Sequence, residues 1–168
     1  MEIRNALLED LDQITELAKI VWYASFTTII SRDQIEYMLS LKYTPEKMRA
    51  DMQDHNAVYL QLEDEDQLMG FASFKPSDEP NLLLLDKLYV HPEQQRKGYG
   101  TMLMSHVEKA AKEAGFEGII LAVNKSNQRA IQAYEKVGFE VIRTETIEIG
   151  DGFTIEDHFM KKTLPKAP

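Results

Sequence analysis

The chain has 168 residues and a formal net charge of −9, with 43% hydrophobic and 28% charged residues. This length suits one domain with its own core, so we expect a single domain over residues 1–168. The acidic balance disfavours nucleic acid as a partner, and the absence of cysteine excludes disulfides, thiolate metal sites and a cysteine nucleophile.

Metal and membrane chemistry are not expected either. The four histidines are scattered without metal-ligand spacing, which predicts no metal site. No apolar run reaches the length of a membrane span, and the N-terminus does not read as a signal peptide. A cytoplasmic protein without membrane contact is therefore expected.

The first third of the chain predicts a strand and three helices. A short strand at residues 2–5 precedes a helix over 10–26, whose apolar residues fall on one stripe. Two short helices follow at residues 34–41 and 45–54. Thr44 is the expected N-cap of the second, with Pro45 in its first turn.

The rest of the chain predicts strands interrupted by two helices. The expected elements are a hairpin of residues 57–63 and 68–75 across an acidic turn, a strand at 82–90, a helix at 99–114, a strand at 118–123, a helix ending at Gly138, and a final hairpin of residues 139–149 and 153–162 turning at Gly150-Asp151-Gly152. This order predicts an α/β fold with a mixed sheet.

The most informative segment is Gln95-Arg96-Lys97-Gly98-Tyr99-Gly100, between a predicted strand and a predicted helix. The free N–H groups at such a helix start, together with the helix dipole, form a site for phosphate. Glycine lets the backbone approach the anion closely. The chain contains no G-x-x-x-x-G-K-[S/T] string, so the segment is not a P-loop. It does not match the dinucleotide fingerprint G-x-G-x-x-G either, because the position of the third glycine, residue 103, is Leu.

Two motifs in order resemble the GNAT superfamily of N-acetyltransferases. The segment at 95–100 resembles the acetyl-CoA pyrophosphate loop of that family. Residues 127–139, with Asn127, Ala130, Tyr134 and Gly138-Phe139, resemble its second conserved segment. Asn124 or Ser126 is the expected N-cap of the helix in this segment. The resemblance covers residues 57–162 and, more weakly, the first 50.

The resemblance implies a GNAT fold, with a mixed, mostly antiparallel sheet, flanking helices and a splayed central strand pair. It also implies acetyl-CoA as cosubstrate, with its pantetheine arm between the strand of Leu88-Tyr89-Val90 and the strand of residues 121–123. The cofactor-binding residues implied by the family are Leu88, Tyr89, Val90, Gln95, Arg96, Lys97, Gly98, Tyr99, Gly100, Thr101, Asn127 and Ala130.

The same resemblance assigns Tyr134 as the general acid for the leaving thiolate. Asp86 stands where many relatives carry a glutamate base, and we expect it to act through ordered water because a carboxylate is a weak direct base. Pairing of Asp86 with Lys87 or with solvent is an equally weighted reading. His158 is an alternative base, although a lone strand histidine is more often structural.

The acceptor is expected to be a small cationic amine. The family builds its acceptor wall where this chain has Trp22, Tyr23 and Phe26. The C-terminal segment, residues 149–152 and 155–162, resembles the ending of bacterial spermidine/spermine N-acetyltransferases. Core packing of the three aromatic residues is the competing interpretation.

Several functional alternatives remain open. They are acetylation of a protein N-terminus, of a lysine, of an aminoglycoside or of an amino acid, a CoA-binding regulator without catalysis, and a nucleotide-binding module. The residues do not fix the oligomeric state, but dimers are common in the family, which favours a homodimer.

Overall fold

The computed structural model describes residues 1–166 and follows the predicted order of elements. Backbone contacts divide the chain into two compact units. Unit 1 comprises Met1–Lys75 and Leu85–Val107, and unit 2 comprises Pro76–Leu84 and the chain from Glu108 onward. The strand β4 (Leu82–Val90) and the helix α4 (Tyr99–Glu113) each contribute residues to both units.

The strands form one mixed sheet in the order β1-β2-β3-β4-β5-β7-β6, which confirms the predicted fold class. β4 and β5 pair in parallel, whereas the pairs β1–β2, β2–β3, β5–β7 and β6–β7 are antiparallel. The strands other than β4 are β1 (Glu2–Asn5), β2 (Val58–Asp64), β3 (Gln67–Pro76), β5 (Gly118–Asn124), β6 (Glu140–Gly150) and β7 (Phe153–Thr163).

In unit 1 the helices α1 (Leu11–Phe26), α2 (Arg32–Lys42) and α3 (Pro45–Asp54) pack against one another. Thr44 caps α3 by accepting from the Lys47 N–H, as predicted. α2 begins two residues before the predicted start, because the Ser31 hydroxyl accepts from the Gln34 N–H. α1 begins one residue after the predicted start at residue 10, because a separate 3₁₀ turn, Leu8–Asp10, precedes it.

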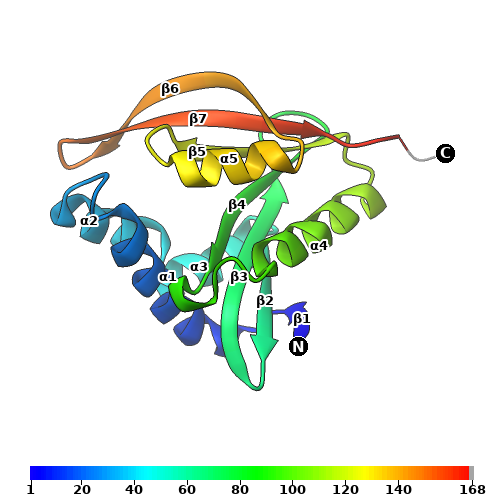
Figure 1. The fold of residues 1–168 in the computed structure, drawn as a ribbon, viewed down its shortest axis with the longest axis horizontal. Helices are drawn as coiled ribbons and strands as arrows, with labels where there is room; N and C mark the ends of the chain where they lie inside the picture. The colour runs from blue at the N-terminus through cyan, green and yellow to red at the C-terminus, as the bar shows by residue number, and fades with distance from the viewer. Residues whose placement is uncertain (167–168) are drawn as a thin grey trace. The chain divides into compact units, whose positions relative to one another are not determined.

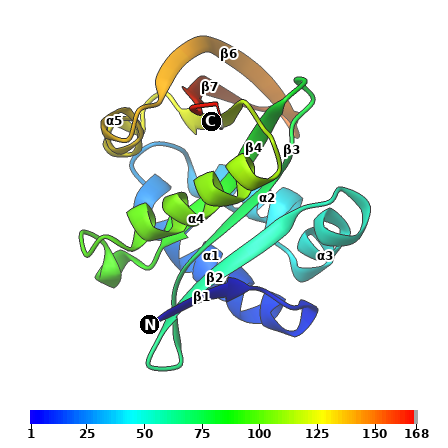
Figure 2. The same cartoon turned by 90° about the vertical axis from the view of Figure 1, so that its right-hand side faces the viewer.

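The sheet of unit 1 lies between helices. In Figures 1 and 2, β2 and β3 run between α3 on one side and the first turns of α4 on the other. The fully buried side chains of unit 1, from the sheet and from the helices, include Ile14, Ile35, Met48, Tyr59, Phe71 and Leu103. The β2–β3 turn is tighter than predicted: Asp64 pairs with Gln67, and only Glu65 and Asp66 turn, both with positive φ.

Unit 2 is built on β5 and the long β6–β7 hairpin, which is prominent in Figure 1. Its core includes Ile119, Leu121 and Met160, and the start of β4 pairs with Gly118–Ile120. The hairpin turns at Asp151-Gly152, where both residues have positive φ (53° and 78°). This conformation fits the Asp-Gly pair that the sequence supplies at that turn.

Candidate active site

The loop between β4 and α4 has the backbone geometry of an anion-binding site. Arg96 and Gly98 adopt φ values of 67° and 84°. Gln95 is extended, with a φ of −70° and a ψ of 158°, and successive N–H groups in a turn with left-handed residues create a concavity suited to an anion. A Cβ at Gly98 would meet no atom within 4 Å, so the space beside this residue is open. The loop therefore fits a pyrophosphate at the start of α4.

The side chains of the loop leave its cationic charge at the surface. Arg96 and Lys97 are exposed, and the Lys97 ammonium donates to Gln94 Oε1 at 2.8 Å. Gln95 Nε2 donates to the Val90 carbonyl oxygen at 3.3 Å, which ties the loop to the end of β4. The Tyr99 hydroxyl donates to Asp64 at 3.4 Å. Both cations are therefore available to a phosphate without breaking a buried contact.

Asp86 lies in a cluster of charged residues on one side of β4. The Lys87 ammonium donates to Asp86 Oδ2 at 2.7 Å and lies 3.5 Å from Asp51 Oδ2, and its side chain is only 1% exposed. Burial would raise the pKa of Asp86, but Lys87 and, more weakly, Lys42 hold that pKa below its usual value. The Asp86 carboxylate is thus ionised at neutral pH and already paired.

Two tyrosine hydroxyls meet next to this cluster. The Tyr43 and Tyr89 oxygens lie 2.8 Å apart, and the Lys87 ammonium lies 5.3 Å from the centre of the Tyr43 ring. Burial is the main reason that the pKa values of both phenols are raised. Both hydroxyls therefore stay protonated at neutral pH. Of these residues, the motifs indicate only the Tyr89 backbone as a site, and they give no signal for Tyr43, for Asp51 or for Lys87 as a buried charge.

The aromatic residues of α1 differ in how accessible they are. Trp22 and Phe26 are 6% and 8% exposed and stack with ring centroids 4.3 Å apart, so they pack in the core. Tyr23 is half-buried, and its hydroxyl donates to Glu36 at 3.4 Å. Of the three residues predicted to bind the acceptor, Tyr23 lines the groove described next.

The groove beside Tyr23 has a volume of about 460 Å³ and lies within unit 1. Its walls come from α1, α2 and the start of α3. They carry Tyr43, the carboxylates of Glu36 and Glu46, and one ammonium, that of Lys19. The other lining residues are Thr15, Leu39, Ser40, Thr44 and Pro45. Aromatic faces beside carboxylates suit an organic cation.

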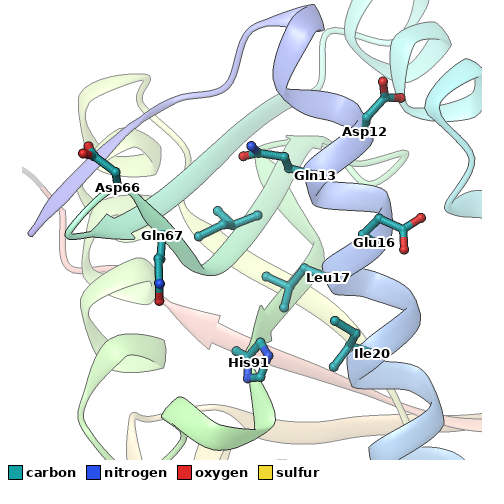
Figure 3. Close-up of a pocket in the computed structure, with 9 residues that line it drawn as sticks. Asp12, Gln13, Glu16, Leu17, Ile20, Asp66, Gln67 and His91 are labelled. Carbon is teal, nitrogen blue, oxygen red and sulfur yellow. The ribbon is translucent and has the colours of Figure 1, made fainter.

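A second groove of similar volume lies between α1 and the end of β4 (Figure 3). Figure 3 shows His91 opposite Leu17 and Ile20, with the Gln67 side chain nearby. Three carboxylates, those of Asp12, Glu16 and Asp66, line this groove, and none of its lining residues is Lys or Arg. These carboxylates favour a cationic ligand, but the predicted acid Tyr134 and the predicted base Asp86 do not line this groove.

In unit 2, Asn127 is itself the N-cap of α5 (Gln128–Lys136), and its Oδ1 accepts from the Ala130 N–H at 3.3 Å. The prediction of Asn124 or Ser126 as the cap was wrong, because Asn124 Oδ1 instead accepts from the Ser126 N–H in the preceding turn. Tyr134 is half-buried, and its ring packs edge-on against Phe139 at 5.7 Å.

His158, the alternative base, lies on the outer hairpin of unit 2. Its Nδ1 lies 2.7 Å from the Thr144 hydroxyl oxygen across the β6–β7 pair. A ring nitrogen engaged in a cross-strand hydrogen bond fits a structural histidine.

Residues 1–166 contain neither a side-chain cluster that could hold a metal nor a helix that could span a membrane. Among these residues no group of three or more His, Asp or Glu side chains is arranged to hold a metal ion. No helix in the same range has the length and apolar character needed to span a membrane.

Comparisons with known proteins agree with the two motifs. Residues 12–139 match the model of the acetyltransferase (GNAT) family. A spermidine N(1)-acetyltransferase of Thermoplasma acidophilum is 29% identical over 95% of this chain and 98% of its own length. The crystal structure of the PaiA N-acetyltransferase of the same organism, in complex with coenzyme A, has a TM-score of 0.80 and 30% identity, covering 97% of this chain and 98% of that one.

More distant structures share the fold alone. A ribosomal-protein-alanine N-acetyltransferase of Brucella melitensis has a TM-score of 0.71 at 21% identity, covering 98% of this chain and 100% of that one. Likeness of this degree carries no information on the acceptor.

Proposed function

The chain belongs to the acetyltransferase (GNAT) family, and on that premise we propose that it acetylates a small cationic amine, with a polyamine as the leading candidate. It is an acyltransferase that uses acetyl-CoA. The observation that carries acetyl transfer is the loop of Gln95–Thr101, whose left-handed residues and open space at Gly98 fit the pyrophosphate of acetyl-CoA.

We place the cosubstrate on the residues implied by the family motifs. The backbone N–H groups of residues 95–101 would bind the pyrophosphate, and Arg96 and Lys97 would add charge to it. The backbone of Leu88-Tyr89-Val90 would hold the pantetheine arm and polarise the thioester carbonyl. Ala130 would lie against the cosubstrate. Asn127 would contact it with the part of its amide that does not cap α5.

In the proposed reaction the amine attacks the thioester carbonyl carbon directly, within a ternary complex. Tyr134 donates its phenolic proton to the sulfur as the carbon–sulfur bond breaks, because a phenol has a pKa close to that of a thiol. The proton that the attacking nitrogen loses as the amide forms restores the phenol. Asp86 accepts the proton that the ammonium loses, by way of ordered water. Its pairing with Lys87 makes it a weak base, so this step is favoured at higher pH.

The acceptor proposal rests on charge and on a relative. The groove beside Tyr23 offers the half-buried ring of Tyr23 and the carboxylates of Glu36 and Glu46 to an organic cation, whereas the Tyr43 ring beneath it is buried. Trp22 and Phe26 would support that wall from the core rather than touch the acceptor. The Thermoplasma relative at 29% identity bears the name of a spermidine acetyltransferase.

The test is release of thiol from acetyl-CoA by the purified chain with a panel of amines. The panel contains spermidine, spermine, an amino acid, an aminoglycoside, a lysine peptide and a peptide with a free N-terminal alanine. We expect turnover with the polyamines. Turnover confined to either peptide would instead identify a protein acetyltransferase, and binding of acetyl-CoA without turnover on any amine would identify a regulator. Light scattering on the same sample tests the proposed homodimer.

A further inference from the structure

We infer that Lys87 is a positioning residue for acetyl transfer: its buried ammonium fixes the Asp86 side chain and keeps that carboxylate ionised, so that it can accept a proton. This inference rests on the proposed role of Asp86 and extends it to a residue that contacts neither substrate nor cosubstrate. Lys87 lies in a strand whose neighbouring residues are mostly apolar.

The burial of Lys87 sets it apart from other lysines. Its side chain is 1% exposed, whereas those of Lys75 and Lys162 are 24% and 22% exposed. A buried ammonium is costly unless it is paired. The chain provides that pairing with Asp86 at 2.7 Å and Asp51 at 3.5 Å. The charge is therefore held by two carboxylates from different elements, β4 and α3.

The second carboxylate is itself held in place. The Tyr59 hydroxyl donates to Asp51 Oδ2 at 3.1 Å, and the Lys75 ammonium lies 3.6 Å from Asp51 Oδ1. The Lys87 ammonium also lies over the rings of Tyr43 and Tyr59, at 5.3 and 5.5 Å. Because Tyr59 and Lys75 hold the Asp51 carboxylate, the Lys87 ammonium that contacts it has little freedom to move. The ammonium in turn orients the Asp86 oxygen to which it donates.

The charged and titratable groups around Asp86 come from every neighbouring element. They are Lys87 and Tyr89 on β4, Lys42 and Tyr43 at the end of α2, Asp51 on α3, Tyr59 on β2 and Lys75 on β3. Lys87 has the largest electrostatic effect on the Asp86 pKa, which it lowers. Its removal would leave a mostly buried carboxylate beside Asp51 without its nearest cation.

The experiment measures the Asp86 pKa by ¹³C NMR of its carboxyl carbon, and the pH profile of kcat/KM, in the wild type and in Lys87→Met. Losing an opposite charge at this distance raises a carboxyl pKa by about one to three units. We expect both the NMR titration and the acid limb of the profile to move to higher pH by such an amount.

Two further variants keep the test decisive. Lys87→Met combined with Asp51→Asn removes the second buried carboxylate, and it replaces the single variant if that one does not fold. Asp51→Asn alone keeps the Lys87–Asp86 pair, so the Asp86 pKa should not rise in this control.

An Asp86 pKa unchanged by the loss of Lys87 would overturn the inference. If the Asp86 pKa rises while the acid limb stays in place, Asp86 is not the base. That result would overturn the proposed role of Asp86 and, with it, that of Lys87, even though the pairing itself is correct.

Discussion

Tyr134 and Asp86 have opposite tasks in the proposed reaction, and their surroundings differ. Tyr134 is half-buried on α5 against the edge of Phe139. Asp86 is paired with a buried ammonium that lowers its pKa. Such a carboxylate is a weak base, so transfer of the ammonium proton to it through water is favoured as the pH rises. The phenolic general acid is then the stronger contributor to the rate.

Replacement of Tyr134 by Phe tests this assignment. The variant keeps the ring packed against Phe139 but removes the proton donor, so kcat should fall well over tenfold. The KM for acetyl-CoA should change little, because the hydroxyl is proposed to act on the departing sulfur. Steady-state kinetics measure both constants. Tyr37→Phe, on α2, is the matched control, and an unchanged kcat in Tyr134→Phe would remove this residue from the acid role.

At the scale of elements, the loop before α4 depends on its backbone conformation. Gly98 has a φ of 84° and a Cβ there would contact nothing within 4 Å. A side chain at this position would therefore meet no steric clash with the protein. It would strain the backbone and occupy the space proposed for the pyrophosphate.

Gly98→Val should therefore abolish measurable binding of acetyl-CoA, as followed by calorimetry. Gly115 provides a matched control, because it has the same φ of 84° and is equally open. Gly115→Val should cost similar stability while keeping the affinity for acetyl-CoA. Retained affinity in Gly98→Val would mean that the pyrophosphate binds elsewhere.

The cap of α5 allows a structural role and a binding role to be separated. Asn127→Ala removes the hydrogen bond to the Ala130 N–H and should cost about 1 kcal/mol of stability. Asn127→Ser keeps a capping oxygen but loses the amide. We expect thermal unfolding to recover in the Ser variant, while the affinity for acetyl-CoA stays low in both. Full recovery of affinity in Asn127→Ser would restrict Asn127 to capping.

The sequence predicts elements better than it predicts the neighbours of a side chain. The strand at Leu82–Val90 and the helix at Pro45–Asp54 were predicted at the bounds that the structure has, because apolar runs and a Thr-Pro start are local signals. The cap of α5 was misplaced because three capping residues occur within four positions.

The charged cluster at Asp86 could not have been predicted in full. Pairing with Lys87 was one reading, because the two are adjacent in sequence. Asp51, on α3, and Tyr59, on β2, reach the same ammonium only through the tertiary fold, because β2 is separated from β4 by β3 in the sheet. One local signal was available, namely a lysine within the apolar strand at residues 82–90.

At the scale of the whole molecule, the net charge of −9 affects the two substrates differently. A negative protein attracts polycations over distances set by the Debye length, about 8 Å at physiological salt. Acetyl-CoA is an anion, and its attraction depends on the short-range cations Arg96 and Lys97. The match to the family includes segments of both units, and one catalytic domain over residues 1–168 stays a prediction.

Salt should therefore distinguish acceptors by their charge. As ionic strength rises from about 0.02 to about 0.5 M, kcat/KM for a polyamine should fall several-fold because screening removes long-range attraction. A monoamine of the same length is the control, and its kcat/KM should fall much less. Initial rates at saturating acetyl-CoA give both slopes. Equal slopes for the two amines would show that the acidic surface plays no part in acceptor capture, and that the charge serves solubility alone.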